Sequence, residues 1–211
     1  MFKKITEALG ITSNKISELI KEGNQYINAV EKVAKEVQNS VAALKSYAET
    51  ETPSLGQAIG SLASTFEIID TENTEKVKRL KEEYIAPLNE LLTSLEKLQS
   101  EQKEAQQASK ELEKAEKRLS KAKSKPKEKL KPNEIETAEN ELKDAKGKVA
   151  KEEEDVKTAT EEFNKLKLET MQKILKNMVD IETVCHEKIL DSVATVKVKA
   201  DAIKVDEESK I

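Results

Sequence analysis

The sequence is poor in the residues that build compact cores and metal sites. Of its 211 residues only 3% are aromatic, tryptophan is absent, and glycine and proline occur five and four times. One cysteine excludes an intramolecular disulfide, and one cysteine with one histidine is too few for a structural zinc site. No apolar run approaches the ~20 residues that span a bilayer, and the start, MFKKITEALG, lacks the continuous apolar core of a secretory signal. We therefore expect a cytoplasmic protein, or one peripheral to a membrane, that holds no metal and no other cofactor.

Charged residues are abundant: they make up 37% of the chain, and hydrophobic residues make up 36%. Such a composition indicates disorder when apolar residues are scattered, but here they recur at helical spacing. Few aromatics with many Ala, Glu, Lys and Leu residues are typical of coiled-coil helices. The net charge of -4 argues against a general nucleic-acid binder. We expect one elongated all-α domain, because no Gly/Ser/Pro-rich linker divides the chain.

The first half of the chain predicts helices over about 12–50, 55–69 and 74–122. Residues 12–50 carry one stripe of apolar positions at steps of three and four, namely Ile16, Leu19, Gly23, Tyr26, Val30, Val33, Val37, Val41 and Leu44. Pro53 ends this pattern, and Ser54 can cap the helix that follows. The helix over 74–122 follows a near-heptad rhythm, which Pro87 should kink rather than end. Its inward positions include Leu88, Leu95 and Gln102.

The lysine-rich segment KRLSKAKSKPKEKLKPNE, residues 117–134, separates this helix from a last one that continues to about residue 200. Asn133 with Glu136 forms an Asn-x-x-Glu cap for that helix. Near the turn the apolar stripe is narrow and rich in alanine, which suits two closely packed helices. At the other end, ILKNMVDIETVCHEKIL and LGQAIGSLASTFEII carry apolar residues on more than one face.

This surplus implies a partner, and self-association is the simplest way to cover it. The expected homodimer interface consists of Leu55, Ile59, Leu62, Phe66, Ile174, Met178, Ile181, Cys185 and Ile189. Around this centre we divide the chain into a possible N-terminal amphipathic segment at 1–12, the folded domain at 13–200 and a polar C-terminal tail at 201–211.

The stretch SLGQAIGSLASTFEIIDTENTEKVKRLKEEYIAPLNELL resembles BAR domains of the endophilin and amphiphysin type. The motifs that carry the resemblance are Leu-Gly-x-Ala-hydrophobic-Gly and hydrophobic-x-Pro-Leu, here Leu55, Gly56, Ala58, Ile59, Gly60, Ile85, Pro87 and Leu88. The resemblance covers roughly residues 50–200, and the first helix has no room for the insertion of the endophilin subgroup. It implies a crescent-shaped homodimer of kinked, antiparallel three-helix coiled coils that binds anionic, curved membranes through its concave face and tips.

Two segments are candidates for membrane contact. Between residues 114 and 131 nine Lys or Arg residues stand against two Glu, and a lysine near an anionic leaflet contributes about 1 kcal/mol. A lysine-rich turn taken alone is usually just solvated, but its place at a hairpin apex and the resemblance favour lipid contact at Lys117, Arg118, Lys121, Lys123, Lys125, Lys127, Lys129 and Lys131. The N-terminus is either an interfacial helix that inserts into lipid or a frayed extension of the first helix, with Phe2, Lys3, Lys4 and Ile5 as its contact residues.

The sequence gives no sign of an enzyme. Cys185 and His186 are adjacent on a helix and point about 100° apart, so they cannot face each other as a catalytic dyad, and Cys185 is better interpreted as a buried hydrophobe. Gly56 and Gly60 form a small-xxx-small pair, which indicates close helix approach. The leading prediction is a peripheral membrane protein that senses or generates curvature, in endocytosis or vesicle trafficking. The alternatives are a helical scaffold for a small GTPase or cytoskeletal partner, and a structural coiled coil without lipid affinity.

Overall fold

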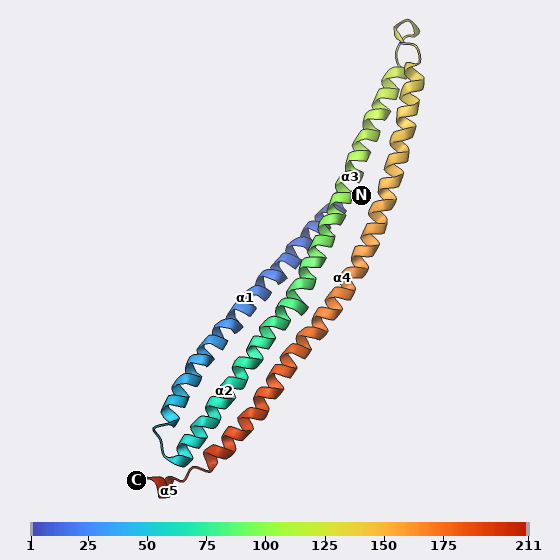
Figure 1. Ribbon diagram of the computed structural model, residues 1–211. Coiled ribbons are helices and arrows are strands. Elements are labelled where there is room, and N and C mark those ends of the chain that lie inside the picture. The colour runs from blue at the N-terminus through green and yellow to red at the C-terminus, as the bar shows by residue number, and fades with distance from the viewer. Residues whose placement is uncertain (1, 210–211) are drawn as a thin grey trace. The chain divides into compact units, whose positions relative to one another are not determined.

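All regular elements of the computed structural model are helices; it describes the backbone of residues 2–209 and the side chains of residues 9–209 (Figure 1). In chain order they are α1 (Phe2–Ala48), α2 (Pro53–Leu80), a π-helix (Lys81–Ile85), α3 (Ala86–Lys123), a 3-10 turn (Lys127–Lys129), α4 (Glu134–Asp201) and α5 (Val205–Glu208). The absence of strands from these residues confirms the predicted all-α fold of long helices. Within residues 2–209, no helix has the length and hydropathy of a bilayer-spanning segment.

The helices form two compact units. We call the first the hairpin unit; it joins the chain up to Ser17 with Glu90–Thr170. We call the second the three-helix unit; it joins Glu18–Asn89 with the chain from Met171 onwards. The division between the units falls within the continuous helices α1 and α4 and not at residue 12 or 200. The expected division of the chain into an N-terminal segment, a folded domain and a C-terminal tail stays a prediction.

Alanine lines the contact between α3 and α4 in the hairpin unit. In Figure 1 these two helices lie side by side up to the loop that joins them. The alanines of the hairpin unit that are 9% exposed or less are Ala105, Ala108, Ala115, Ala122 and Ala138. Side chains this small allow the two helices to approach each other closely. The narrow alanine-rich stripe predicted for this part of the chain is therefore confirmed.

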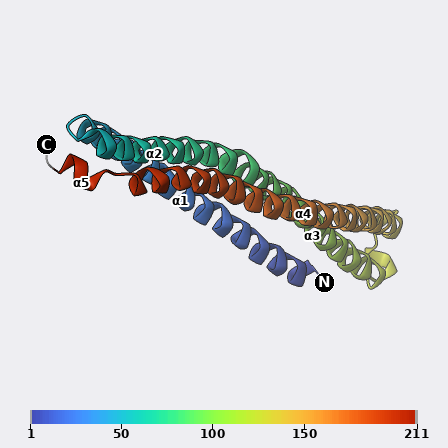
Figure 2. The same ribbon diagram turned by 90° about the horizontal axis from the view of Figure 1, so that it is seen from below.

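Each helix of the three-helix unit contributes one residue to the centre of its core. Ile27 of α1, Leu80 of α2 and Ile181 of α4 pack together, and each is 2% exposed or less. Val77, Tyr84, Ile85 and Met178 pack around them. Within this unit α1 and α4 run in the same direction and α2 runs in the opposite one (Figures 1 and 2).

The exposed side of α1 corrects one part of the predicted stripe. Leu19, Tyr26 and Val33 were expected to face inward, but they are 39, 40 and 52% exposed. The core side of α1 instead includes Ile27 and Ala34, with exposed fractions of 2 and 9%. The apolar stripe is thus wider than the core it covers, and its edge at every seventh residue remains open.

The helix between Pro53 and the lysine-rich loop is continuous except at Pro87. The predicted break between residues 69 and 74 is wrong, because residues 70–73 are helical. Pro87 lacks the N–H that would bond to the carbonyl of Glu83, four residues back. The backbone widens into the π-helix just before it, and the Asn177 side chain of α4 donates to the Glu83 carbonyl at 3.4 Å. The predicted distortion at Pro87 is therefore present, with helix on both sides.

Two predicted helix caps are wrong. Ser54 does not cap α2 with its side chain; its N–H donates to a carboxylate of Glu208, at 3.0 Å, from the C-terminal segment. Asn133 adopts a positive φ of 61° instead of capping α4, which asparagine tolerates better than most residues. Glu134 takes the place expected for Glu136, since its carboxylate accepts the Lys131 N–H at 3.1 Å.

The glycine pair of α2 is only half explained by close approach. A Cβ at Gly56 would lie 2.8 Å from the carbonyl oxygen of Ala48, so only glycine lets the two helices meet here. Gly60 has nothing within 4 Å of its Cβ position. Packing within the chain therefore does not explain why glycine stands at position 60 of the small-xxx-small pair.

Candidate membrane-binding hairpin

The loop between α3 and α4 is shaped by two prolines and one asparagine. Pro126 precedes the 3-10 turn, and its carbonyl accepts the Lys129 N–H at 2.9 Å. Pro132 and Asn133 then reverse the chain, and the Asn133 carbonyl accepts the first bond of α4 from Thr137 at 2.9 Å. We call residues 121–131 the hairpin tip. It contains six lysines and one acidic residue, Glu128.

Half of the eight cations expected to bind lipid are ion-paired within the chain. Arg118 and Lys123 of α3 reach Glu141 and Glu139 of α4, each at 2.8 Å. The other two pairs are Lys125 with Glu134 and Lys117 with Glu113. The Arg118 and Lys123 pairs hold the two helices together, whereas the Lys117 pair lies within α3 and the Lys125 pair joins the loop to the start of α4. These four positive charges are therefore already paired with carboxylates of the same chain.

The other four cations, Lys121, Lys127, Lys129 and Lys131, are exposed. Among the residues that the structure describes, no carboxylate lies within ion-pair distance of any of them. Nearby, hydrogen bonds from Lys125 and then from the Lys131 backbone hold the pKa of Glu134 below its ordinary value, so this carboxylate stays charged and keeps the loop closed. The structure thus concentrates unpaired positive charge at the hairpin tip.

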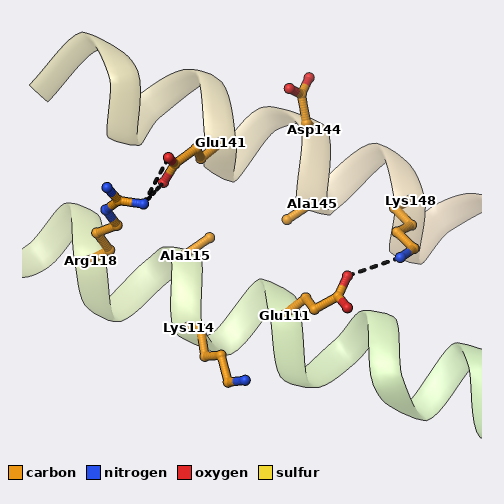
Figure 3. A pocket seen from close by; sticks show the side chains of 8 residues that line it. All are labelled: Glu111, Lys114, Ala115, Arg118, Glu141, Asp144, Ala145 and Lys148. Atoms are coloured by element: carbon orange, nitrogen blue, oxygen red, sulfur yellow. Dashed lines mark hydrogen bonds and ion pairs between the residues drawn. The ribbon is translucent and has the colours of Figure 1, made fainter. Parts of the chain in front are cut away.

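An open groove of about 430 Å³ lies between α3 and α4 below the tip (Figure 3). Ala115 and Ala145 face each other across it, while Arg118 pairs with Glu141, and Lys148 pairs with Glu111 at 2.9 Å. The hydrogen bond from Lys148 lowers the pKa of Glu111, and the same bond raises that of Lys148. The remaining lining residues, Lys114 and Asp144, point away from the facing helix. The charges of this groove are therefore matched in pairs, which favours a role in helix pairing over ligand binding.

Three carboxylates form the only acidic group within the described side chains that is tight enough to hold a metal ion. The ligand atoms of Glu101, Glu104 and Glu152 lie within 4.8 Å of one another. Lys148 is close enough that Glu152 and Glu104 raise its pKa. Only Glu104 of the three is exposed, and the other two are half-buried. Surface glutamates balanced by a lysine are common on helices, and we assign no metal to them.

Of the N-terminal candidate, residues 1–12, the structure describes the backbone from residue 2 and the side chains from residue 9. Residues 2–12 form the first turns of α1. The side chains of Phe2, Lys3, Lys4 and Ile5 lie outside the described residues. Insertion of this segment into lipid stays a prediction.

The expected dimer interface divides between core and surface. Ile174, Ile181 and Cys185 are 4% exposed or less and belong to the core of the chain, so they cannot contact a second copy directly. Met178 packs against the same core. The half-buried remainder consists of Leu55, Ile59, Leu62, Phe66 and Ile189. Leu62 and Phe66 line an open apolar groove beside Leu44 and Tyr47 of α1.

The sequence pattern indicated apolar residues on more than one face of this part of α4, but it did not name the outward set. Leu175, Val179, Leu190 and Val193 are 47–68% exposed. These residues are separated by four, eleven and three positions, which places them on one side of the helix, beside the inward-facing residues.

A charged network joins the three helices beside the core. Lys76 of α2 is 8% exposed, and its ammonium lies 2.7 Å from the Glu182 carboxylate of α4. The Tyr26 hydroxyl of α1 donates to the same carboxylate at 2.7 Å. Burial would raise the pKa of Glu182, but hydrogen bonds from Lys76 and Tyr26 outweigh it and lower the pKa. Glu182 is therefore held ionised.

Cys185 and His186 lie as their helical spacing predicts. Cys185 is buried, and burial raises the pKa of its thiol. The His186 side chain is 66% exposed, and its Nδ1 lies 2.7 Å from the Glu182 carbonyl. The two side chains do not face each other, and the cysteine is a small buried hydrophobe.

Known proteins resemble this chain in fold and, at low identity, in sequence. The N-terminal I-BAR domain of D. discoideum IBARa is 14% identical and matches with a TM-score of 0.57, over 99% of this chain and 94% of that one. The F-BAR domain of Drosophila Syndapin/PACSIN is 13% identical with a TM-score of 0.43, over 95% and 84%. A comparison with curated protein sequences finds no match.

One protein family covers nearly the whole sequence. Its sequence model, described as FAM92 protein, matches residues 1–210. The match includes the hairpin tip and both of its flanking helices, and the I-BAR likeness supports the same fold. The chain belongs to the FAM92 family and has a BAR-type fold.

Proposed function

We propose that this protein binds anionic membranes peripherally through its hairpin tip and, as a homodimer, senses or generates membrane curvature at the cytoplasmic face. The BAR-type fold supports membrane binding and curvature sensing in general. The observation that carries the proposal is the set of unpaired, exposed lysines at the tip, Lys121, Lys127, Lys129 and Lys131. Endocytosis and vesicle trafficking are processes in which such an activity would serve.

The physical basis is adhesion by charge on a stiff helical scaffold. Each lysine near an anionic leaflet contributes about 1 kcal/mol, and the attraction falls off within a Debye length. A few lysines on one hairpin therefore bind weakly. Two hairpins on one dimer bind together, because the first contact raises the effective concentration of the second. The crescent shape implied by the BAR resemblance would then select membranes of matching curvature.

The proposal is tested by reversing charge at the tip. We expect Lys127→Glu with Lys129→Glu to lower binding to phosphatidylcholine–phosphatidylserine vesicles by at least about tenfold, because four attractive charges per dimer become repulsive. Sedimentation with vesicles measures this, and sedimentation velocity without lipid checks that the oligomeric state is unchanged. The matched control is Lys197→Glu with Lys199→Glu, which makes the same charge change on exposed residues of α4. The control should bind like the original protein.

Salt separates this function from the alternatives. Binding by charge weakens as ionic strength rises and as phosphatidylserine is removed. A scaffold for a small GTPase or cytoskeletal partner, or a coiled coil without lipid affinity, would show no binding to these vesicles. Equal binding by the tip variant and the control would overturn the proposed role of the tip.

A further inference from the structure

Ser124 is the one residue of the hairpin tip, residues 121–131, that carries a hydroxyl group. In the sequence KAKSKPK, residues 121–127, a lysine lies one and three positions to either side of it. The side chains of Ser124 and of all four lysines are exposed. An anionic group attached to this hydroxyl would therefore have positive charges as its nearest neighbours on both sides along the chain.

Ser124 also lies where the regular helix ends. Helix α3 ends at Lys123, and the Ser124 N–H donates to the Ser120 carbonyl at 3.1 Å. The Ser124 hydroxyl donates to the Lys121 carbonyl at 3.0 Å. Two residues further on, Pro126 has no N–H and adopts φ -59° and ψ 143°. Because helix ends fray, only the bonds of one turn have to open before this segment is extended.

These two features suit the substrate site of a protein kinase that selects basic sequences. Such an enzyme holds the substrate as an extended segment, and its acidic side chains recognise the lysine or arginine residues beside the acceptor hydroxyl. Ser120 is the other exposed serine nearby, but it lies inside α3. The two cations before it, Lys117 and Arg118, are already ion-paired within the chain. Ser124 is therefore the better acceptor of the two.

We propose that Ser124 is a phosphorylation site whose modification releases the hairpin tip from anionic membranes. The γ-phosphoryl group of a nucleoside triphosphate is transferred to the Ser124 Oγ. A new P–O bond forms, the bond to the leaving nucleoside diphosphate breaks, and the hydroxyl proton passes to the kinase. The inference rests on the proposed function and adds the regulation of the same site.

The phosphate acts on the lysines that carry the proposed function. The six lysines and one glutamate of the tip give it a net charge of +5. A phosphate adds about -1.5 to -2 charges at pH 7. Lys121 lies three residues before Ser124, on the same side of the last helical turn, so its ammonium can bind the phosphate by a charge-assisted hydrogen bond. Phosphorylation thus lowers the net charge of the tip and withdraws one unpaired lysine from lipid.

The phosphate also weakens the turn that holds Ser124. The Ser124 Oγ would lose the proton that it donates to the Lys121 carbonyl. The C-terminus of a helix carries a partial negative charge, which repels a phosphate placed there. The helices below stay together, because the pairs of Arg118 and Lys123 with α4 do not involve Ser124. We therefore expect a change confined to the tip.

Phosphate transfer to the whole chain tests the acceptor. We expect protein kinase C, an enzyme that prefers basic residues around its acceptor, to phosphorylate Ser124 in the presence of Mg²⁺ and ATP. Mass spectrometry locates the phosphate. Ser124→Ala should remove this incorporation, whereas Ser120→Ala should leave it unchanged. Absence of phosphate from residue 124, or incorporation that depends on Ser120 instead, would overturn the site.

Vesicle binding tests the consequence. The chain with phosphoserine installed at residue 124 is compared with the unmodified chain by sedimentation with phosphatidylcholine–phosphatidylserine vesicles. We expect at least about tenfold weaker binding, because each tip of a dimer loses about two positive charges. Ser124→Ala should bind like the unmodified chain, since the hydroxyl carries no charge.

The matched control carries the same phosphate elsewhere. Ser209 is also exposed, but it belongs to the three-helix unit. Phosphoserine at residue 209 should leave vesicle binding unchanged. Circular dichroism and sedimentation velocity without lipid check that helix content and oligomeric state are the same in all forms.

The outcomes separate this inference from the proposed function. An unmodified chain that does not bind the vesicles overturns the proposed function and this inference together. Equal binding of the unmodified chain and the chain phosphorylated at residue 124 overturns only the inference. Equal weakening by phosphoserine at residues 124 and 209 would assign the effect to overall charge, and it would overturn the special role of Ser124.

Discussion

Gly23 lies where α1 meets the side chains of the π-helix. A Cβ at this position would overlap the Tyr84 ring and lie 2.8 Å from the Ile85 Cδ1. Overpacking of this kind costs about 1–3 kcal/mol, whereas replacing glycine by alanine within a helix gains about 1 kcal/mol. We therefore expect Gly23→Ala to lower the free energy of unfolding by about 1 kcal/mol, as measured by urea denaturation.

Gly147 provides the control for this prediction. It is an exposed residue in the interior of α4, and nothing lies within 4 Å of its Cβ position. Gly147→Ala should therefore raise the free energy of unfolding by about 0.5–1 kcal/mol through helix propensity alone. A shift in the same direction for both variants would show that the packing around Gly23 is not tight.

Counting the Lys and Arg residues of the hairpin does not show which of them are ion-paired. The sequence gives a cluster of like charges, but it does not say which of them meet a carboxylate from α4. Arg118 lies 23 residues before its partner Glu141, and the contact exists only because the two helices fold back on each other. The separation into paired and unpaired cations is thus a property of the tertiary structure.

At the scale of elements, the C-terminal segment caps α2. Glu208 of α5 accepts the Ser54 N–H at 3.0 Å, and the Ser54 hydroxyl accepts the Lys204 N–H at 2.9 Å. A carboxylate at a helix N-terminus satisfies free N–H groups and interacts favourably with the helix dipole. A segment expected to be a polar tail therefore takes part in the fold of the three-helix unit.

This cap has a pH dependence with a defined sign. A hydrogen bond from Thr52, followed by bonds from Ser54 and Leu55, holds the pKa of Glu208 below its ordinary value of 4.5. A lowered pKa in the folded state means that the cap is fully present above pH 4.5 and is lost as the pH falls through the folded value. We expect the Ser54 amide resonance to titrate below pH 4.5 in NMR spectra. In Glu208→Gln this titration should be absent; its persistence would assign the shift to another group.

The elements also differ in how well their sequences predict them. The near-heptad rhythm of 74–122 predicts buried positions such as Leu88, Leu95 and Gln102, and all three are 2% exposed or less. The break expected at residues 70–73 is absent because polar residues there are held by tertiary contacts. Glu72 is 9% exposed and pairs with Lys188 of α4 at 2.9 Å. No pattern within α2 indicates that partner.

At the scale of the whole molecule, the helical spacing of apolar residues predicted an all-α chain with a hairpin. Pro53 and Pro87 predicted where the first helix ends and where the second is distorted. The helix caps were not predictable, because Glu208 lies 154 residues from Ser54. The sequence indicated that this part of α4 is apolar on more than one face, but it did not separate the outward residues from the inward ones, since Leu175 follows Ile174 directly and Leu190 follows Ile189. Solvent exposure separates the two sets, and it follows only from the packed structure.

The central claim is that the hairpin tip contacts lipid, and a fluorescent label that responds to its surroundings tests it most directly. The label is attached at Lys129→Cys in one variant and at Lys199→Cys in another, and phosphatidylcholine–phosphatidylserine vesicles are added. We predict a blue-shifted emission for the label at residue 129, reversed by salt, and no shift for the label at residue 199. A shift at residue 199 without one at residue 129 would contradict the account.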